Sequence, residues 1–252
     1  MGFVIALSGK GGMGKTTLAA LMVRRLSRVR GKAVLAVDAD PNSGLGEALG
    51  VSPEHTLADI REDTREDRLQ LSAGMSKERH IELLIQSCLV EGNKFDLLTM
   101  GRPEGPKCYC YVNNLLRKYL DEATKKYPIV VIDNEAGMEH LSRRTTNNVD
   151  ELFVVSDATR QGARTVGRIM KLADSLPILV KRKEVLLNNI VPGADAADFR
   201  AAMRDAGFSV ALEVPYDRGL YEACAAGKPI FDLPDSSEAL QQLSKFLDER
   251  VP

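Results

Sequence analysis

The stretch GKGGMGKTT, residues 9–17, constrains the fold of this chain more than any other feature. It follows the apolar run FVIALS (3–8) and opens a helical pattern over 15–29. The spacing G-x-x-x-x-G-K-T between a strand and a helix is typical of a phosphate-binding loop, whose backbone N–H groups surround nucleotide phosphates. Lys15 is expected to reach the β- and γ-phosphates, and the Thr16 hydroxyl to hold Mg²⁺. The alternative is a glycine-rich turn that binds nothing. The residues expected to contact nucleotide are Gly9, Lys10, Gly11, Gly12, Met13, Gly14, Lys15, Thr16 and Thr17.

Apolar runs alternate with helical patterns along the whole chain. The predicted strands span 3–8, 33–38, 95–100, 129–133, 152–156, 185–191 and 210–215. The predicted helices span about 15–29, 76–90, 112–126, 160–174, 195–206, 217–226 and 236–249. The strands lack strict alternation, which is typical of a mostly parallel sheet covered by helices on both faces. The sequence therefore predicts a single-domain, doubly wound α/β P-loop fold over 1–252, with edge insertions at about 50–75 and 101–111.

Composition excludes several classes of protein. The net charge is −1 and the charges are interspersed, which argues against a nucleic-acid partner because such proteins usually carry a basic face. The stretch MGFVIALSGKGG has no basic region of the kind that opens a signal peptide, and its apolar run is too short to span a membrane. Four cysteines in such a chain do not indicate a disulfide framework. We therefore expect a soluble cytoplasmic protein with no membrane partner.

Acidic residues follow two of the predicted strands. AVDADPN places Asp38 and Asp40 at the end of the second strand, and IVVIDNEAG places Asp133 at the end of the fourth. Ligands of open α/β sheets bind at this edge, so these carboxylates are expected near the phosphate loop. The alternative for each is a helix N-cap, which is common at the same edge.

A second lysine, Lys10, lies inside the phosphate loop and gives the pattern K-G-G-x-G-K-T-T. With this pattern the sequence resembles the MinD/ParA/nitrogenase-iron-protein family of dimeric P-loop ATPases. The resemblance implies a homodimer in which Lys10 crosses the interface to the partner's nucleotide, as an arginine finger does. It further implies that Asp40 orients the attacking water, and that Asp38 and Asp133 contribute to the Mg²⁺ shell directly or through water. Lys10, Lys15 and Asp40 are thus the expected catalytic residues; a solvated loop lysine is the alternative for Lys10.

Two further segments resemble the adenine-binding loops of this family. LLNNIVPG (186–193) would supply Asn188, and EVPYD (213–217) would supply Pro215 and Asp217. The alternatives are a turn asparagine and an ordinary helix-capping residue.

The stretch GPKCYCYVNN places Cys108 and Cys110 just before a helical pattern. Thiols near a helix N-terminus ionise easily, and in an extended segment both would lie on one face. Two thiolates are half of a tetrahedral site, and a two-fold dimer would bring a second pair to give four sulfurs for Zn²⁺, Ni²⁺ or an Fe–S cluster. The alternative is a pair of unliganded thiols. Cys88 and Cys224 lie on apolar helical patterns and are expected in the core.

The runs CYCYVNN (108–114) and VVIDNEAGMEHLSR (130–143) narrow the resemblance to the CooC-type nickel-insertion ATPases. This subfamily implies ATP/ADP, Mg²⁺ and Ni²⁺ as ligands, with Zn²⁺ able to occupy the thiol site, and carbon monoxide dehydrogenase as client. The related AcsF type, which serves acetyl-CoA synthase, fits the same residues. Two other classes remain as alternatives: a MinD- or ParA-like spatial regulator, and an ATP-driven reductase with a bridging Fe–S cluster.

Overall fold

The computed structural model describes residues 2–29, 33–60, 75, 77–102, 108–136, 148–193 and 195–252. At residues 77–78, 81 and 108–115 it describes the backbone alone. Most of the predicted insertion at 50–75 and part of that at 101–111 lie outside the described residues.

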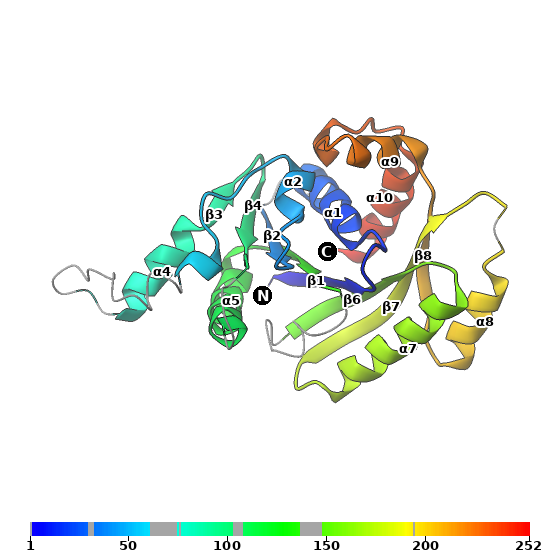
Figure 1. The fold of residues 1–252 in the computed structure, drawn as a ribbon, viewed down its shortest axis with the longest axis horizontal. Coiled ribbons are helices and arrows are strands. Elements are labelled where there is room, and N and C mark those ends of the chain that lie inside the picture. The colour runs from blue at the N-terminus through cyan, green and yellow to red at the C-terminus, as the bar shows by residue number, and fades with distance from the viewer. Residues whose placement is uncertain are drawn as a thin grey trace.

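One sheet of eight strands forms the centre of the described part of the chain (Figure 1). In spatial order the strands are β3 (Leu89–Glu91), β4 (Phe95–Thr99), β2 (Val34–Ala39), β5 (Ile129–Asn134), β1 (Phe3–Gly9), β6 (Asn148–Ser156), β7 (Leu179–Ile190) and β8 (Val210–Pro215). Neighbouring strands are parallel except β3, which pairs antiparallel with β4. The predicted doubly wound α/β fold is confirmed. The edge strand β3 was not predicted because it is short and carries no apolar run of its own.

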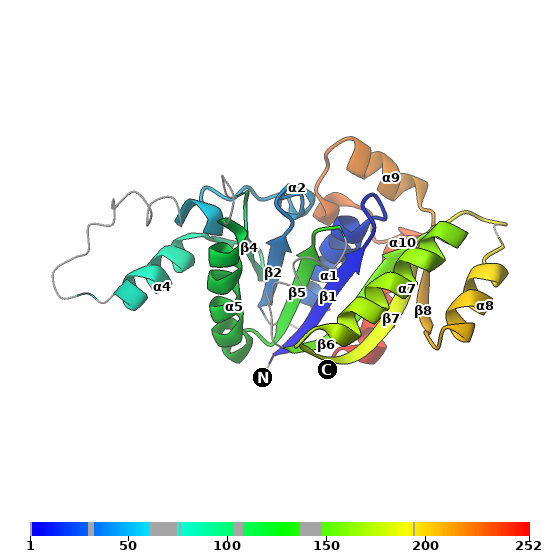
Figure 2. The same cartoon turned by 60° about the horizontal axis from the view of Figure 1, so that its bottom comes forward.

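Helices cover both faces of the sheet (Figures 1 and 2). One face carries α1 (Lys15–Val29), α2 (Leu45–Leu49), the 3₁₀ helix η1 (Ile230–Asp232) and α10 (Glu238–Arg250). The other carries α4 (Lys77–Ser87), α5 (Cys108–Lys126), α7 (Arg160–Ser175) and α8 (Ala197–Asp205). Helix α9 (Arg218–Ala225) connects β8 to η1 and has no buried residue.

Each strand supplies apolar side chains to two separate cores. In β1, Val4 and Ala6 pack with the α5 and α7 side, whereas Ile5 and Leu7 pack with the α1 and α10 side. Because successive residues of a strand point to opposite faces, a strand covered on both sides must be apolar at every position. This is the reason that the strand sequences are continuous apolar runs. None of the helices in the described ranges combines the length and apolar character needed to cross a bilayer.

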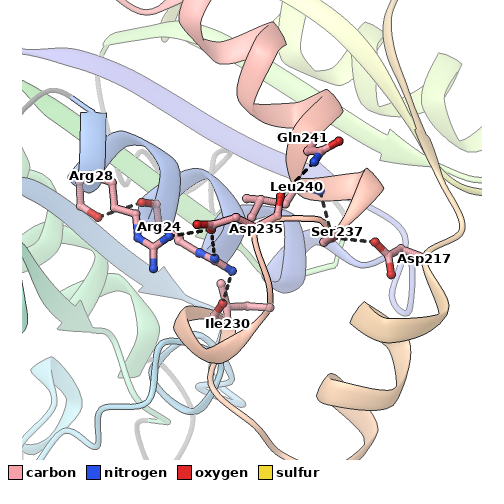
Figure 3. A network of polar contacts seen from close by, with 9 residues as sticks. Arg24, Arg28, Asp217, Ile230, Asp235, Ser237, Leu240 and Gln241 are labelled. Atoms are coloured by element: carbon pink, nitrogen blue, oxygen red, sulfur yellow. Dashed lines mark hydrogen bonds and ion pairs between the residues drawn. The ribbon is translucent and has the colours of Figure 1, made fainter.

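A buried arginine attaches the end of the chain to the helix that follows the phosphate loop (Figure 3). The side chain of Arg24 in α1 is only 2% exposed. Its guanidinium donates to the Ile230 carbonyl at 2.8 Å and pairs with Asp235 at 2.5 Å, and Arg28 pairs with the same carboxylate at 2.8 Å. Since a buried charge is costly unless partnered, these contacts position η1 and α10 against α1.

Candidate nucleotide-binding site and thiol pair

The loop over residues 9–17 lies between β1 and α1, as the motif predicts. Lys15 is the first residue of α1 and is 7% exposed, and its Nζ donates to the Lys10 carbonyl at 3.4 Å. Lys10 itself is exposed. The first turn of α1 carries no acidic residue, so the positive end of the helix dipole is not neutralised from within the helix. The strand–loop–helix context required for phosphate binding is therefore present.

Two glycines of the motif occupy positions where a side chain would not fit. Gly14 has φ +84°, and a Cβ on it would lie 2.4 Å from Nδ2 of Asn188. Gly9 has φ +147°, and a Cβ there would lie 2.3 Å from the carbonyl oxygen of Val155. The loop can therefore approach the neighbouring strands β6 and β7 only with glycine at both positions.

The carboxylates predicted at the strand ends meet beside the loop. Asp38 of β2 and Asp133 of β5 are register partners in the parallel sheet, and both are buried. The Thr16 hydroxyl donates to Oδ2 of Asp133 at 2.6 Å. Asp40 is partly exposed, and its Oδ1 accepts hydrogen bonds from the backbone and side-chain amides of Asn42 at 2.8 and 3.0 Å. The structure thus brings together the four side chains Thr16, Asp38, Asp40 and Asp133.

Burial makes the carboxyl groups of Asp38 and Asp133 weaker acids than an exposed aspartate. Desolvation raises the pKa of Asp38 to about 7, and the nearby Asp133 charge adds to the rise, although the backbone N–H groups of Leu45 and Asp40 oppose it. Desolvation likewise raises the pKa of Asp133 to about 6, against the opposing effects of the Thr16 hydrogen bond and the Lys15 charge. Two buried carboxylates without a cation between them are an unfavourable arrangement.

The donor set at Asp133 fits Mg²⁺. Among the described residues, Oδ1 of Asp133 is buried and has no hydrogen-bond partner, while Oδ2 contacts the Thr16 hydroxyl. Carboxylate and hydroxyl oxygens are the hard ligands that Mg²⁺ prefers, and it commonly takes one or two carboxylates together with nucleotide phosphates. Asp133 and Thr16 are therefore the residues suited to hold the ion, with Asp38 adjacent.

Asn134 is a residue of this site to which the sequence assigned no role. It is 1% exposed, and its Nδ2 donates to the Leu7 carbonyl at 2.8 Å, joining β5 to β1 next to the phosphate loop. Within the described part of the chain its Oδ1 has no partner. The sequence signal that could have identified Asn134 as part of the site is its position directly after Asp133.

The two segments predicted to bind adenine lie next to each other and to the loop. Ile190 and Pro215 are register partners across β7 and β8, and the Tyr216 amide donates to the Ile190 carbonyl at 2.8 Å. Asn188 is 7% exposed, and its Nδ2 donates to the Met13 carbonyl at 2.9 Å. In this structure, Asn188 therefore contacts the phosphate loop itself.

Asp217 forms the junction between two helices (Figure 3). It is the N-cap of α9, with Oδ1 accepting from the Leu220 amide at 3.0 Å. Its Oδ2 accepts from the Ser237 hydroxyl at 2.6 Å and from the Ala239 amide at 3.4 Å, at the start of α10. Although partial burial opposes ionisation, these hydrogen bonds lower the pKa of Asp217. The capping role weighed as the alternative for this residue is present in the structure.

Replacing Asp217 is expected to destabilise the protein. Asp217→Ala removes acceptors from the first turns of α9 and α10, and loss of one N-cap typically costs about 1–2 kcal/mol. Chemical denaturation should show this loss, whereas Asp217→Asn should retain most of the stability because asparagine also caps helices. An unchanged free energy of unfolding for Asp217→Ala would contradict the capping role. Because the folded-state pKa is lowered, this stabilisation should decline as the pH falls below about 4.

The helix predicted over 112–126 begins earlier, at Cys108. Cys108 and Cys110 therefore lie in the first turn of α5, and the expectation of an extended segment was wrong. Positions two apart in an α-helix are separated by about 200° around its axis, so the helical backbone does not provide the common face that an extended strand would. The predicted placement of both cysteines at a helix N-terminus is confirmed. For these two residues the structure describes the backbone and not the side chains.

The other two cysteines, Cys88 and Cys224, differ in burial. Cys88 is buried, as predicted, and burial raises the pKa of its thiol to about 12. Cys224 is exposed on α9, so the prediction that it belongs to the core was wrong. Its Sγ lies 4.0 Å from Oγ1 of Thr17 in the phosphate loop. Among the described side chains, no three His, Cys, Asp or Glu residues gather as a metal-binding group.

Known proteins resemble this chain over nearly its full length. An uncharacterized ATP-binding protein of Methanocaldococcus jannaschii is 42% identical over 250 residues, covering 98% of both chains. The carbon monoxide dehydrogenase accessory protein CooC of Rhodospirillum rubrum is 32% identical over 259 residues, covering 98% of this chain and 97% of CooC. The structure of the septum site-determining protein MinD of Pyrococcus horikoshii, in complex with Mg-ADP, matches with a TM-score of 0.71 at 21% identity, covering 99% of this chain and 96% of MinD.

The family model described as the CobQ/CobB/MinD/ParA nucleotide binding domain matches residues 4–230. This range contains the phosphate loop, Asp38, Asp133 and the segments around Asn188 and Asp217. The chain therefore belongs to the CobQ/CobB/MinD/ParA nucleotide-binding family and is a P-loop ATPase of the MinD/ParA type.

Proposed function

We propose that this ATPase binds nickel through Cys108 and Cys110 of two subunits and delivers it to carbon monoxide dehydrogenase. The observation that carries the proposal is the 32% identity to CooC over nearly the whole chain, together with the two cysteines in the first turn of α5. A helix N-terminus lowers thiol pKa values and so favours metal-binding thiolates. An acetyl-CoA synthase client of the AcsF type fits the same residues. We place this activity in the cytoplasm, without a membrane or nucleic-acid partner.

The nucleotide chemistry follows from the site. Backbone N–H groups of the phosphate loop and the Lys15 ammonium bind the phosphates, and the segments at Asn188, Pro215 and Asp217 adjoin the adenine. Asp133 and Thr16 would hold Mg²⁺, which would supply positive charge to the nucleotide phosphates. Asp40 orients the attacking water, and exposed Lys10 reaches the nucleotide of the partner subunit. ATPases of this family typically form ATP-dependent dimers, which supports a role for Lys10 in trans.

The fold offers a physical link between the thiols and the nucleotide. Helix α5 begins at Cys108 and ends at Lys126, and only Tyr127 and Pro128 separate it from β5, which carries Asp133. The Tyr127 hydroxyl donates to Asp96 of β4 and so attaches this connection to the sheet. The thiol pair and the Mg²⁺ carboxylate thus belong to one continuous helix–strand unit. In the proposed cycle, ATP-driven dimer closure changes the geometry around the thiols, and hydrolysis resets it.

Metal stoichiometry tests this proposal. If four thiolates from two chains hold one ion, equilibrium binding of Ni²⁺ should saturate at about one ion per dimer. Cys108→Ser and Cys110→Ser should each abolish tight binding, because a hydroxyl replaces a thiolate in both halves of the site. Affinity should fall with decreasing pH as the thiolates are protonated, and Zn²⁺ should compete with Ni²⁺.

Cys224→Ser is the matched control, since Cys224 is an exposed thiol on another helix. It should bind Ni²⁺ like the wild type. ATP hydrolysis should survive the Cys108 and Cys110 substitutions at least in part, because other segments build the nucleotide site. Saturation at one ion per monomer, unaffected by either substitution, would contradict the shared site. The ATPase would remain, and a MinD- or ParA-like spatial regulator would become the better proposal.

A further inference from the structure

A positively charged groove lies between α7 and the segment that follows α8. Helices α7 and α8 cover the sheet face away from α1 and α10 (Figure 2). The volume of the groove is about 570 Å³. The residues that line this α7–α8 groove are Arg164, Gly167, Arg168, Lys171, Ala206 and Phe208. No acidic side chain contributes to this lining, so the groove presents three cations beside one half-buried aromatic ring.

The three cations have no partners in the described part of the chain. Arg164, Arg168 and Lys171 are exposed and follow one another at spacings of four and three residues, which places them on one face of α7. No carboxylate of the described residues pairs with any of them. Like charges at this spacing destabilise a helix, so the fold of the chain does not explain the arrangement.

Two other arginines of this region have acidic partners. Arg160 pairs with Asp198 at 3.9 Å, and Arg200 of α8 pairs with Glu213 at 2.5 Å. Asp174, near the end of α7, pairs with Lys183 of β7 and not with its own helix. These pairs leave Arg164, Arg168 and Lys171 without an acidic partner among the described residues.

Gly167 is a second and independent observation. It lies in the middle of α7, where glycine is less stable than alanine. A Cβ built on Gly167 would meet nothing within 4 Å, so no contact inside the described chain requires glycine here. Gly162 of the same helix differs, since its Cβ would lie 2.4 Å from Oδ1 of Asp157. The indentation at Gly167 allows close approach of something outside the chain, between Arg164 and Arg168.

We propose that the α7–α8 groove docks an acidic α-helix of a partner protein. Carboxylates spaced four and three residues apart on such a helix match the three cations of α7, and a helix backbone can approach closely over Gly167. Phe208 and Ala206 offer apolar contact, which favours a protein over the phosphates of a nucleic acid or a membrane surface. This inference does not depend on the nickel proposal, and its failure would leave the metal site untouched.

A designed peptide tests the proposal with the full-length protein. The probe is an alanine-based helical peptide with glutamates at spacings of four and three and a leucine on the same face; a scrambled peptide of the same composition is the reference. Fluorescence anisotropy at several salt concentrations should show salt-dependent binding of the designed peptide in preference to the scrambled one. Arg168→Glu should weaken binding by about 10-fold or more, because like charges then oppose each other. Lys245→Glu, a charge reversal at an exposed position of α10, should bind as the wild type does.

Gly167→Ala separates docking from folding. The substitution should leave the thermal midpoint of unfolding equal or higher, since alanine favours the helix. It should nevertheless weaken binding of the designed peptide, because the added methyl group blocks close approach of the peptide backbone to α7. Equal affinity for designed and scrambled peptides, or an Arg168→Glu variant that binds normally, would overturn the proposal. So would tighter, Arg168-dependent binding of double-stranded DNA or of phosphatidylglycerol vesicles, which would assign the groove to those ligands.

Discussion

Asp133→Asn should lower Mg²⁺-dependent ATP hydrolysis by about 100-fold or more, because a bound metal ion typically contributes several kcal/mol to stabilising charge in the transition state. The same substitution should make the protein more stable when no Mg²⁺ or nucleotide is present. Both effects arise from one buried carboxylate whose Oδ1 has no partner among the described residues. Hydrolysis rates at saturating Mg²⁺ and unfolding in EDTA measure the two effects separately.

The direction of the stability effect follows from the raised pKa. Burial raises the pKa of Asp133 from 3.8 to about 6 in the folded protein. The folded state therefore binds more protons than the unfolded state between about pH 4 and 6, and stability falls as the pH rises through that window. Above it, the ionised carboxylate destabilises the metal-free protein by on the order of 1–3 kcal/mol. Asparagine carries no charge and still accepts the Thr16 hydrogen bond, so the gain should be seen at pH 8 and vanish near pH 4.

Asp150→Asn is the control, because Asp150 is also a strand carboxylate but is fully partnered. It accepts from the Val4 amide at 2.8 Å and pairs with Lys181 at 2.6 Å. This variant should lose stability and keep its ATPase activity, the reverse of Asp133→Asn. A destabilised Asp133→Asn protein at pH 8 in EDTA, or one that hydrolyses ATP at nearly the normal rate, would remove Asp133 from the Mg²⁺ site.

The two loop lysines should differ in what their loss abolishes. Lys15→Ala should prevent nucleotide binding, because the Lys15 ammonium contacts the loop backbone at Lys10 and is the group expected to face the β- and γ-phosphates. Lys10→Ala should bind nucleotide normally but lose ATP-dependent dimerisation and reduce hydrolysis by about 10³-fold, the lower range for a cation supplied in trans. Nucleotide titration, sedimentation with ATP and phosphate release measure these properties.

Mixing the two variants tests the trans role directly. In a mixed dimer, the Lys10→Ala subunit binds ATP through its own Lys15, and the Lys15→Ala subunit contributes an intact Lys10. Partial recovery of hydrolysis on mixing supports action across the interface. If Lys10 acts only within its own subunit, the rate of ATP hydrolysis should change neither when the two variants are mixed nor when the mixture is diluted. Lys245→Ala, which removes an exposed lysine on α10, should behave as the wild type throughout.

Local patterns in the sequence predicted much of the nucleotide site. The G-x-x-x-x-G-K-T spacing depends on residues adjacent in the chain, so the backbone between β1 and α1 is the predicted one. Asp38 and Asp133 were located because parallel strands place their carboxyl ends at the same edge. Strand and helix order followed from apolar periodicity, whereas short elements such as β3 and α2 have too few residues to show a period.

Other features depend on packing between distant segments. The start of α5 at Cys108 was missed because the helical pattern of apolar residues becomes recognisable only further along the helix, and the sequence before it is rich in Gly and Pro. Cys224 was expected in the core because α9 is apolar in sequence, yet α9 contributes no buried residue. Asn188 contacts the Met13 carbonyl only because β7 lies beside the phosphate loop in the folded sheet.

The sequence by itself determined the phosphate loop, its two lysines, the strand-end carboxylates and the parallel sheet that presents them, because each rests on short-range spacing or on the period of apolar residues. Only the tertiary structure decided the environment of those groups. The pairing of β2 with β5 places Asp38 beside Asp133, and burial in the folded sheet raises the pKa of both carboxyls. That burial depends on residues nearly 100 positions apart in the chain. The fold likewise places Ala206 and Phe208, which follow α8, beside the three cations of α7, in a chain of net charge −1.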